Sequence, residues 1–158
     1  MRAILPLLLG CASFGATAQD KMLVQLPALL DPAVVVDKDV TEECKLAALV
    51  GDRVFDRIKA VNPGATAATA SPGEERLIRL RITAAQMIPA VQVRRLTVSA
   101  ELVEGERVIA TSSFRDSSAA MPGYGLGLCD IMGNVATAIG RKVASWARRD
   151  YATRRNPN

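Results

Sequence analysis

The chain has 158 residues and a net charge of +4, and 49% of its residues are hydrophobic. This size and composition predict one ordinary domain with a substantial core. The sequence contains no histidine, which excludes Ser-His-Asp and Cys-His catalysis and removes the commonest transition-metal ligand. We therefore expect no catalytic centre, no metal site and no cofactor.

The first eighteen residues have the pattern of a secretory signal peptide. Arg2 gives a short positive end, an apolar run follows, and small residues ending at Ala18 suit cleavage before Gln19. The apolar run is too short to span a bilayer, and we expect no transmembrane helix in the mature chain. The sequence thus predicts a periplasmic or secreted protein, with one domain over 19–150 and a basic flexible tail over 151–158.

A second interpretation of the same segment centres on Cys11. Leu8-Leu9-Gly10-Cys11 resembles a bacterial lipobox, in which the cysteine is lipidated and becomes the first residue. Gly10 suits that motif, whereas Leu9 is larger than the residue usual there. The alternative to soluble export is therefore a lipid anchor to the envelope through Cys11.

Two broken apolar runs open the predicted domain. Pro27 and Pro32 interrupt the runs 23–30 and 34–36. Because proline cannot donate a hydrogen bond to a strand ladder, we expect edge or irregular strands here.

An amphipathic helix is predicted next, beginning near Asp39, an N-cap acceptor that precedes Glu42 by three residues. One arc of this helix is apolar, and the other is charged. The apolar arc consists of Ala47, Val50, Gly51, Val54, Phe55, Ile58 and Val61. Asn62-Pro63-Gly64 predicts the helix end, and 64–75 predicts a loop or a weak edge strand.

Three strands follow, because apolar and polar residues alternate with a period of two. The segments are 78–82, 96–102 and 108–114, and Glu104-Gly105 predicts a hairpin turn between the last two. One face of this sheet is expected to be buried and the other wet.

A small-residue loop over 116–127 then leads to a second amphipathic helix over 128–149. Its inward arc consists of Cys129, Met132, Val135, Ala136, Ile139, Val143, Trp146 and Ala147. The predicted fold class is α+β, a two-layer sandwich in the order strand, helix, three strands, helix. The sheet is mostly antiparallel, and both helices pack on one face.

Cys44 and Cys129 each lie on the buried arc of a helix, in a chain that export carries to an oxidising compartment. Gly51, Gly133 and Gly140 share these arcs and would let two helix backbones approach closely. The sequence therefore predicts a structural disulfide between the two cysteines. A redox-active pair is the alternative, although such cysteines are usually two residues apart.

Two groups of residues suggest binding. Gly123, Gly125 and Gly127 precede a helix N-terminus, so they form either an anion-binding loop or a plain connection. Four arginines, Arg79, Arg81, Arg94 and Arg95, are expected on or near the wet face of the sheet. This face lacks the aromatic residues that stack on bases, so we expect no nucleic-acid partner.

The function predicted from these features is that of a non-catalytic envelope protein. It would be a small disulfide-stabilised module that binds another envelope protein or a surface component. The alternative is a carrier of a small amphiphile or lipid in a cavity between the helices and the sheet. An enzyme that works through carboxylates and lysine ranks third, and the basic C-terminus offers peripheral contact with an anionic membrane.

Overall fold

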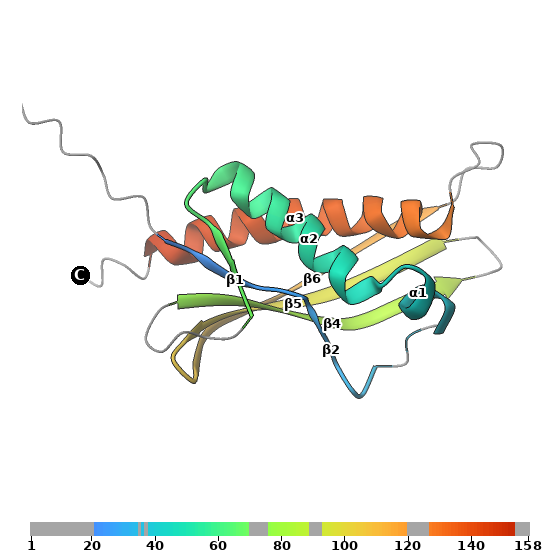
Figure 1. Ribbon diagram of the computed structural model, residues 1–158, viewed down its shortest axis with the longest axis horizontal. Helices are drawn as coiled ribbons and strands as arrows, with labels where there is room; N and C mark the ends of the chain where they lie inside the picture. Colours follow the sequence, from blue (N-terminus) through green and yellow to red (C-terminus); the bar gives the residue numbers. More distant parts are fainter. Residues whose placement is uncertain are drawn as a thin grey trace, which may run out of the picture.

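The computed structural model describes residues 21–34, 36, 38–69, 76–88, 93–119 and 127–153. The elements in chain order are β1 (Leu23–Gln25), β2 (Leu29–Leu30), α1 (Lys38–Glu43), α2 (Leu46–Val61), β3 (Thr66–Ala68), β4 (Arg76–Ile88), β5 (Val93–Glu104), β6 (Arg107–Ala119) and α3 (Leu128–Thr153). Helices α2 and α3 lie side by side on one face of the sheet (Figure 1). This is the α+β arrangement predicted from the sequence.

The sheet is mixed but mostly antiparallel, with the strand order β3-β1-β4-β5-β6. Strands β4, β5 and β6 form a long antiparallel meander, while β1 pairs in parallel with both β3 and β4. Strand β2 also pairs in parallel with β4, beside β1. The meander supplies most of the sheet, and the short N-terminal strands complete one side of it.

The expectation that the first apolar run forms only edge or irregular strands is wrong for β1. This strand lies between β3 and β4, and Val24 is fully buried. Pro27 lies two residues beyond the end of β1, so it removes no hydrogen bond from that ladder. The peptide N–H of Leu26 instead continues the pairing by donating to the Ala68 carbonyl at 2.9 Å.

The first predicted helix is broken in two. Helix α1 ends at Glu43, and Lys45 adopts a left-handed conformation with φ of 47° before α2 begins at Leu46. This turn brings Leu46 into the core with no exposed surface. The expectation that Val61 lies on the buried arc is wrong, because this last residue of α2 is 49% exposed.

Two elements extend beyond their predicted ends. Strand β6 includes 116–119, which the small polar residues there had suggested to be loop, because Asp116 pairs with Leu96 and Ser118 with Arg94 of β5. Helix α3 continues past 149 to Thr153. Backbone pairing and helix continuation thus override the local preference of these residues for turns and termini.

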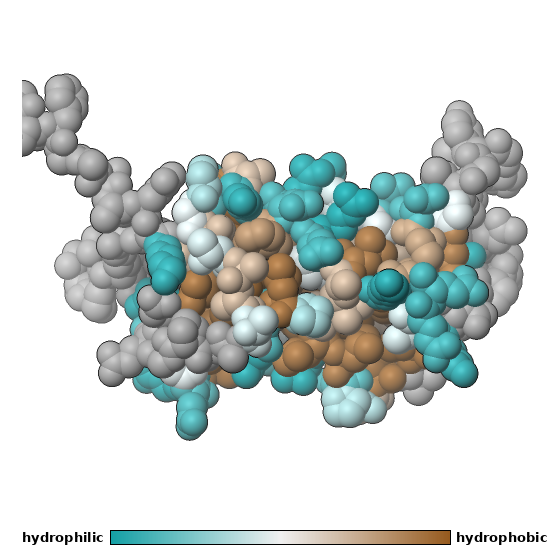
Figure 2. All heavy atoms as spheres, in the orientation of Figure 1, coloured by the Kyte–Doolittle hydropathy of each residue, from teal (hydrophilic) through white to brown (hydrophobic). Residues whose placement is uncertain are grey.

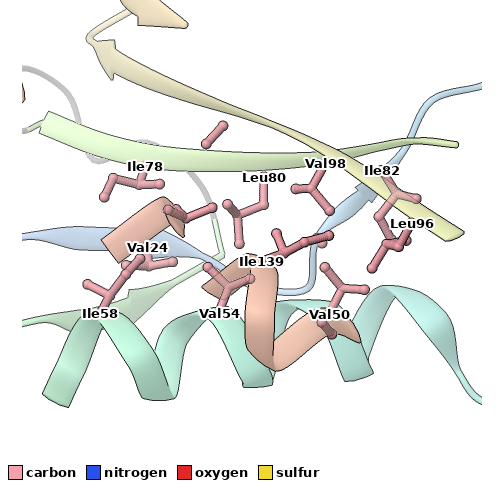
Figure 3. Packing of buried hydrophobic residues seen from close by; sticks show 14 of the residues in the cluster. Val24, Val50, Val54, Ile58, Ile78, Leu80, Ile82, Leu96, Val98 and Ile139 are labelled. Carbon is pink, nitrogen blue, oxygen red and sulfur yellow. The ribbon is translucent and has the colours of Figure 1, made fainter. Parts of the chain in front are cut away.

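The core fills the space between the two layers. Val54 of α2, Leu80 of β4, Val98 of β5 and Ile139 of α3 are all fully buried, and their side chains point toward one another (Figure 3). The inward arc predicted for α3 is confirmed at every position except Cys129, which is partly exposed. The sheet face opposite the helices remains polar.

Candidate functional site

The two cysteines of the described chain form a disulfide. Cys44, next to the break between α1 and α2, is joined to Cys129 in the first turn of α3, with their Cα atoms 5.1 Å apart. The bond therefore fixes the start of α3 against the junction of the two preceding helices. It closes a loop of 85 residues along the chain.

The N-terminus of α3 is occupied by its own side chain. The Gly127 N–H donates to the Asp130 carboxylate at 3.2 Å, which neutralises part of the positive end of the helix. Gly123 and Gly125 lie outside the described residues, as do Ala18, Gln19 and Cys11. In the described part of the glycine loop, the helix N-terminus is therefore capped by Asp130. This capping does not support the anion-binding interpretation.

The arginines of the sheet have separate environments. Arg79 pairs with Glu101 at 2.7 Å on the polar face, and Arg76 pairs with Glu104 at 3.0 Å near the hairpin. The hydrogen bond from Arg76 holds the pKa of Glu104 below its ordinary value, and Arg107 acts in the same direction. Arg79 on the polar face and Arg76 near the hairpin are therefore each paired with a glutamate of β5.

Arg94 lies near the start of β5, as predicted. It is two residues from the buried Leu96, so it lies on the helix-facing side of the strand, and its Nε and Nη1 atoms are buried without a hydrogen-bond partner. Arg95 points to the opposite, polar face.

A basic groove runs along the outer flank of α3, above the edge strand β6. Its volume is about 430 Å³, and its lining residues are Phe114 of β6 and Arg141, Lys142, Ser145 and Arg149 of α3. Phe114 also packs edge-on against Trp146, which fixes α3 over the strand. We use the name "basic groove" for these five lining residues.

Lys142 and Asp116 close one end of this groove. The Lys142 Nζ lies 2.8 Å from the Asp116 carboxylate and donates to the Arg115 carbonyl at 2.8 Å. Asp116 also accepts a hydrogen bond from the Ser117 N–H at 2.8 Å. These bonds hold the pKa of Asp116 below its ordinary value, with Lys142 as the larger cause and burial opposing it.

The opposite edge of the sheet carries partly exposed apolar side chains. The apolar edge, as we name it, consists of Leu26, Leu29, Leu30, Val34 and Val36, in and around β2. Leu30 is 38% exposed. Figure 2 shows hydrophobic residues gathered across the middle of this side, over β1 and β2 and below the polar flank of α2.

Sequence reasoning did not identify the basic groove, because its residues come from two elements whose relative placement is a tertiary property. The available signal was the spacing of Arg141, Ser145 and Arg149, which puts all three on one flank of a helix. Among the residues that the structure describes, no helix is long and apolar enough to cross a membrane. Within the same residues, no cluster of three or more acidic, cysteine or histidine side chains could hold a metal ion.

Similarity to known proteins lies in the fold. No protein-family model matches the chain, and neither does any curated protein. The PelC dodecamer from Paraburkholderia phytofirmans aligns with a TM-score of 0.56 and 13% identity, over 80% of this chain and 85% of that one. A protein from Xanthomonas campestris of the family DUF330 aligns with a TM-score of 0.57 and 13% identity, over 86% and 92% of the two chains.

Proposed function

We propose that the protein is an exported, non-catalytic accessory module of the cell envelope, which binds another envelope component through the apolar edge. The observation that carries this proposal is the exposure of apolar side chains around β2, with Leu30 at 38%. Apolar surface that stays in contact with water is stabilised when a partner covers it. A disulfide between Cys44 and Cys129 suits an oxidising compartment outside the cytoplasm.

The fold comparisons support the same proposal at a coarser level. PelC, which shares the fold, is described as a dodecamer, so in that protein this fold makes protein–protein contacts. A second copy of the present chain is accordingly one candidate occupant of the apolar edge. A different envelope protein is the occupant that we propose.

Photo-crosslinking in intact cells tests the proposal. A photoreactive residue replaces Leu30 in one variant and Val61, which is 49% exposed at the end of α2, in a matched control. We expect a covalent adduct with an envelope protein from position 30 and none from position 61. Equal labelling at both positions, or no adduct at position 30, would contradict the proposal. An adduct of the chain with itself would show that a second copy of the chain, and not a different protein, covers the apolar edge.

The mass of the N-terminus, measured on the same captured protein, addresses its location. We expect a chain that begins at Gln19, the residue after the predicted cleavage site. An acylated Cys11 would instead place the protein on a lipid anchor, and an uncleaved Met1 would contradict export.

The carrier of a small amphiphile stays a prediction. The space between helices and sheet is lined by fully buried side chains such as Val54, Leu80 and Ile139. The basic groove lies instead on the outer flank of α3. This placement favours the binding module over the carrier.

A further inference from the structure

The outward-facing backbone of β6 can be identified from its hydrogen bonds. No other strand pairs with the outer side of β6 within the described part of the chain. The Arg115 carbonyl accepts from Lys142 and the Ser117 N–H donates to Asp116, so the backbone groups of both residues point away from β5. In an antiparallel strand the backbone groups of alternate residues point the same way.

Thr111 and Ser113 therefore present their N–H and C=O groups outward as well, because the β5–β6 register is regular from Ala110 to Ala119. Both residues are exposed. Farther along the strand, Lys142 occupies the Arg115 carbonyl and Asp116 occupies the Ser117 N–H. The N–H and C=O groups of Thr111 and Ser113, together with the Arg115 N–H, are thus left open to a strand from another molecule.

The basic groove lies directly beside this open segment. Phe114, between Ser113 and Arg115, lines the groove, and Lys142 reaches from α3 to the Arg115 carbonyl. A strand added to β6 would therefore direct every second side chain into the groove.

The spacing of the groove residues matches that of an added strand. Arg141, Ser145 and Arg149 stand on successive turns of α3, about 6 Å apart along the helix axis. Side chains on one face of a strand repeat every ~6.7 Å. Trp146 contacts Phe114 while Lys142 contacts Asp116, so α3 runs antiparallel to β6 along this stretch.

We propose that the basic groove and the open edge of β6 together bind an extended acidic segment of another protein by strand addition. Two carboxylates four positions apart in that segment would meet Arg141 and Arg149, and an apolar residue between them would cover Phe114. The backbone hydrogen bonds supply affinity and the alternate side chains supply specificity. This surface is separated from the apolar edge by β4 and β5, and it does not depend on the function proposed above.

Peptide binding to the disulfide-bonded protein tests this inference. The probe is a fluorescent peptide, Thr-Glu-Thr-Val-Thr-Glu-Thr, followed by anisotropy. Replacing both glutamates of the peptide with lysine should abolish binding. Replacing its valine and the threonine after it with proline should also abolish binding, because the charge is kept but an N–H that points to β6 is lost whichever way the added strand runs.

Variants of the protein separate charge from backbone pairing. Arg141→Glu with Arg149→Glu is expected to weaken binding by at least about tenfold, as the loss of charge-assisted bonds implies. Arg148→Glu, a charge reversal on the same helix outside the groove, should change affinity less than about twofold. Ser113→Pro removes an outward N–H that β5 does not use, so the fold should persist while binding is lost.

Hydrogen exchange of the unmodified protein gives an independent readout. The Thr111 and Ser113 amides should become protected when the peptide binds. Binding that survives Ser113→Pro and protects neither amide would overturn strand addition and leave a general polyanion surface. Vesicles of phosphatidylglycerol that bind while the peptide does not would make a membrane the occupant and overturn the proposal.

Two remaining outcomes also decide against the inference. Absence of peptide binding at millimolar concentration would overturn it. Protection of Thr111 and Ser113 in a dimer without peptide would assign this edge to a second copy of the chain.

Discussion

Asp116 joins three parts of the molecule through one carboxylate. It pairs with Lys142 of α3, accepts the Ser117 N–H of its own strand, and lies next to the carbonyl that Lys142 caps. The side chains of Asp116 and Lys142 are 27% and 48% exposed, so solvent screens their attraction. The pair directs geometry more than it adds stability.

Acid should remove the contribution of Asp116. Its folded pKa lies below the ordinary value of 3.8, so the unfolded state binds the proton more readily. The stabilisation is complete above the unfolded pKa and is lost as the pH falls through the folded pKa. We expect Asp116→Asn to be less stable than the wild type by under ~1 kcal/mol at pH 6, and we expect this difference to shrink at pH 2.5.

Urea unfolding at the two pH values measures this difference. Asparagine keeps an acceptor for the Ser117 N–H, so the comparison isolates the charge. A stability gap that is the same at both pH values would show that the charge of Asp116 has no role.

The disulfide acts through the unfolded chain. The bond closes a loop of 85 residues, which restricts the conformations of the unfolded chain. The chain-entropy model gives a stabilisation of the folded state of about 4 kcal/mol for this loop. Replacing Cys44 and Cys129 together by alanine should therefore lower the melting temperature strongly. Circular dichroism measures the loss, and crosslinking from position 30 should persist in whatever remains folded, because the bond serves stability and contributes no residue to the apolar edge.

A redox-active pair would behave differently. Loss of crosslinking in the double alanine variant at a temperature where circular dichroism shows it folded would contradict a purely structural bond. An unchanged melting temperature would contradict it as well.

At the scale of elements, α2 and α3 are in close contact at Gly140. A Cβ placed there would lie 3.0 Å from the Arg53 carbonyl and 3.2 Å from the Val54 Cα, which are backbone atoms that cannot move alone. Gly133, two turns earlier on the same face of α3, has its nearest neighbours at 3.8 Å. The two glycines therefore serve as a matched pair.

Gly140→Ala should destabilise the protein by about 1–3 kcal/mol, because the helices must separate. Gly133→Ala should leave stability unchanged or raise it by up to ~1 kcal/mol, since alanine favours a helix interior. Urea denaturation of both variants measures the contrast. Equal stability of the two would show that the helix contact at Gly140 is looser than its geometry indicates.

The sequence predicted α3 well because an uninterrupted apolar arc defines both the element and its buried face. It could not predict the break at Lys45, since a lysine in a left-handed conformation leaves no local signal of the kind that glycine or asparagine gives. The position of β1 inside the sheet could not be predicted from the sequence either. Three residues of parallel strand are positioned by β3 and β4, which come later in the chain.

The candidate surfaces were predictable to different degrees. The broken apolar runs around β2 were visible in the sequence, and the structure shows that Leu30 stays exposed. The basic groove depends on how α3 is aligned over Phe114 and Asp116. That alignment is set by contacts between residues far apart in the sequence, such as Phe114 with Trp146, and has no local signature.

At the scale of the whole molecule, the two long sides of the sheet differ in character. One side carries the apolar edge, and the other is the 13-residue strand β6, guarded partly by Asp116 and Lys142. Long unpaired edges invite association with other strands, and charged side chains near an edge discourage it.

Removing the Asp116–Lys142 ion pair from the edge of β6 should increase self-association. For Asp116→Ala with Lys142→Ala we expect the average mass in sedimentation velocity to rise with protein concentration, more than it does for the wild type. The control is Asp52→Ala with Lys59→Ala, which removes the same two charge types from the exposed flank of α2. Identical behaviour of the two double variants would assign no protective role to the pair on β6.

The central position of β1 has a mechanical consequence. This strand begins at Leu23, close to the N-terminus, and is held between two parallel neighbours. Since the hydrogen bonds of a strand run across its axis, a force applied at the N-terminus would act on the bonds to β3 and β4 together, in shear, and not on one pair after another. Extraction of β1 would also uncover Val24, which has no exposed surface. A force that pulls on the chain ahead of Leu23 would thus pass directly into an interior strand of the sheet.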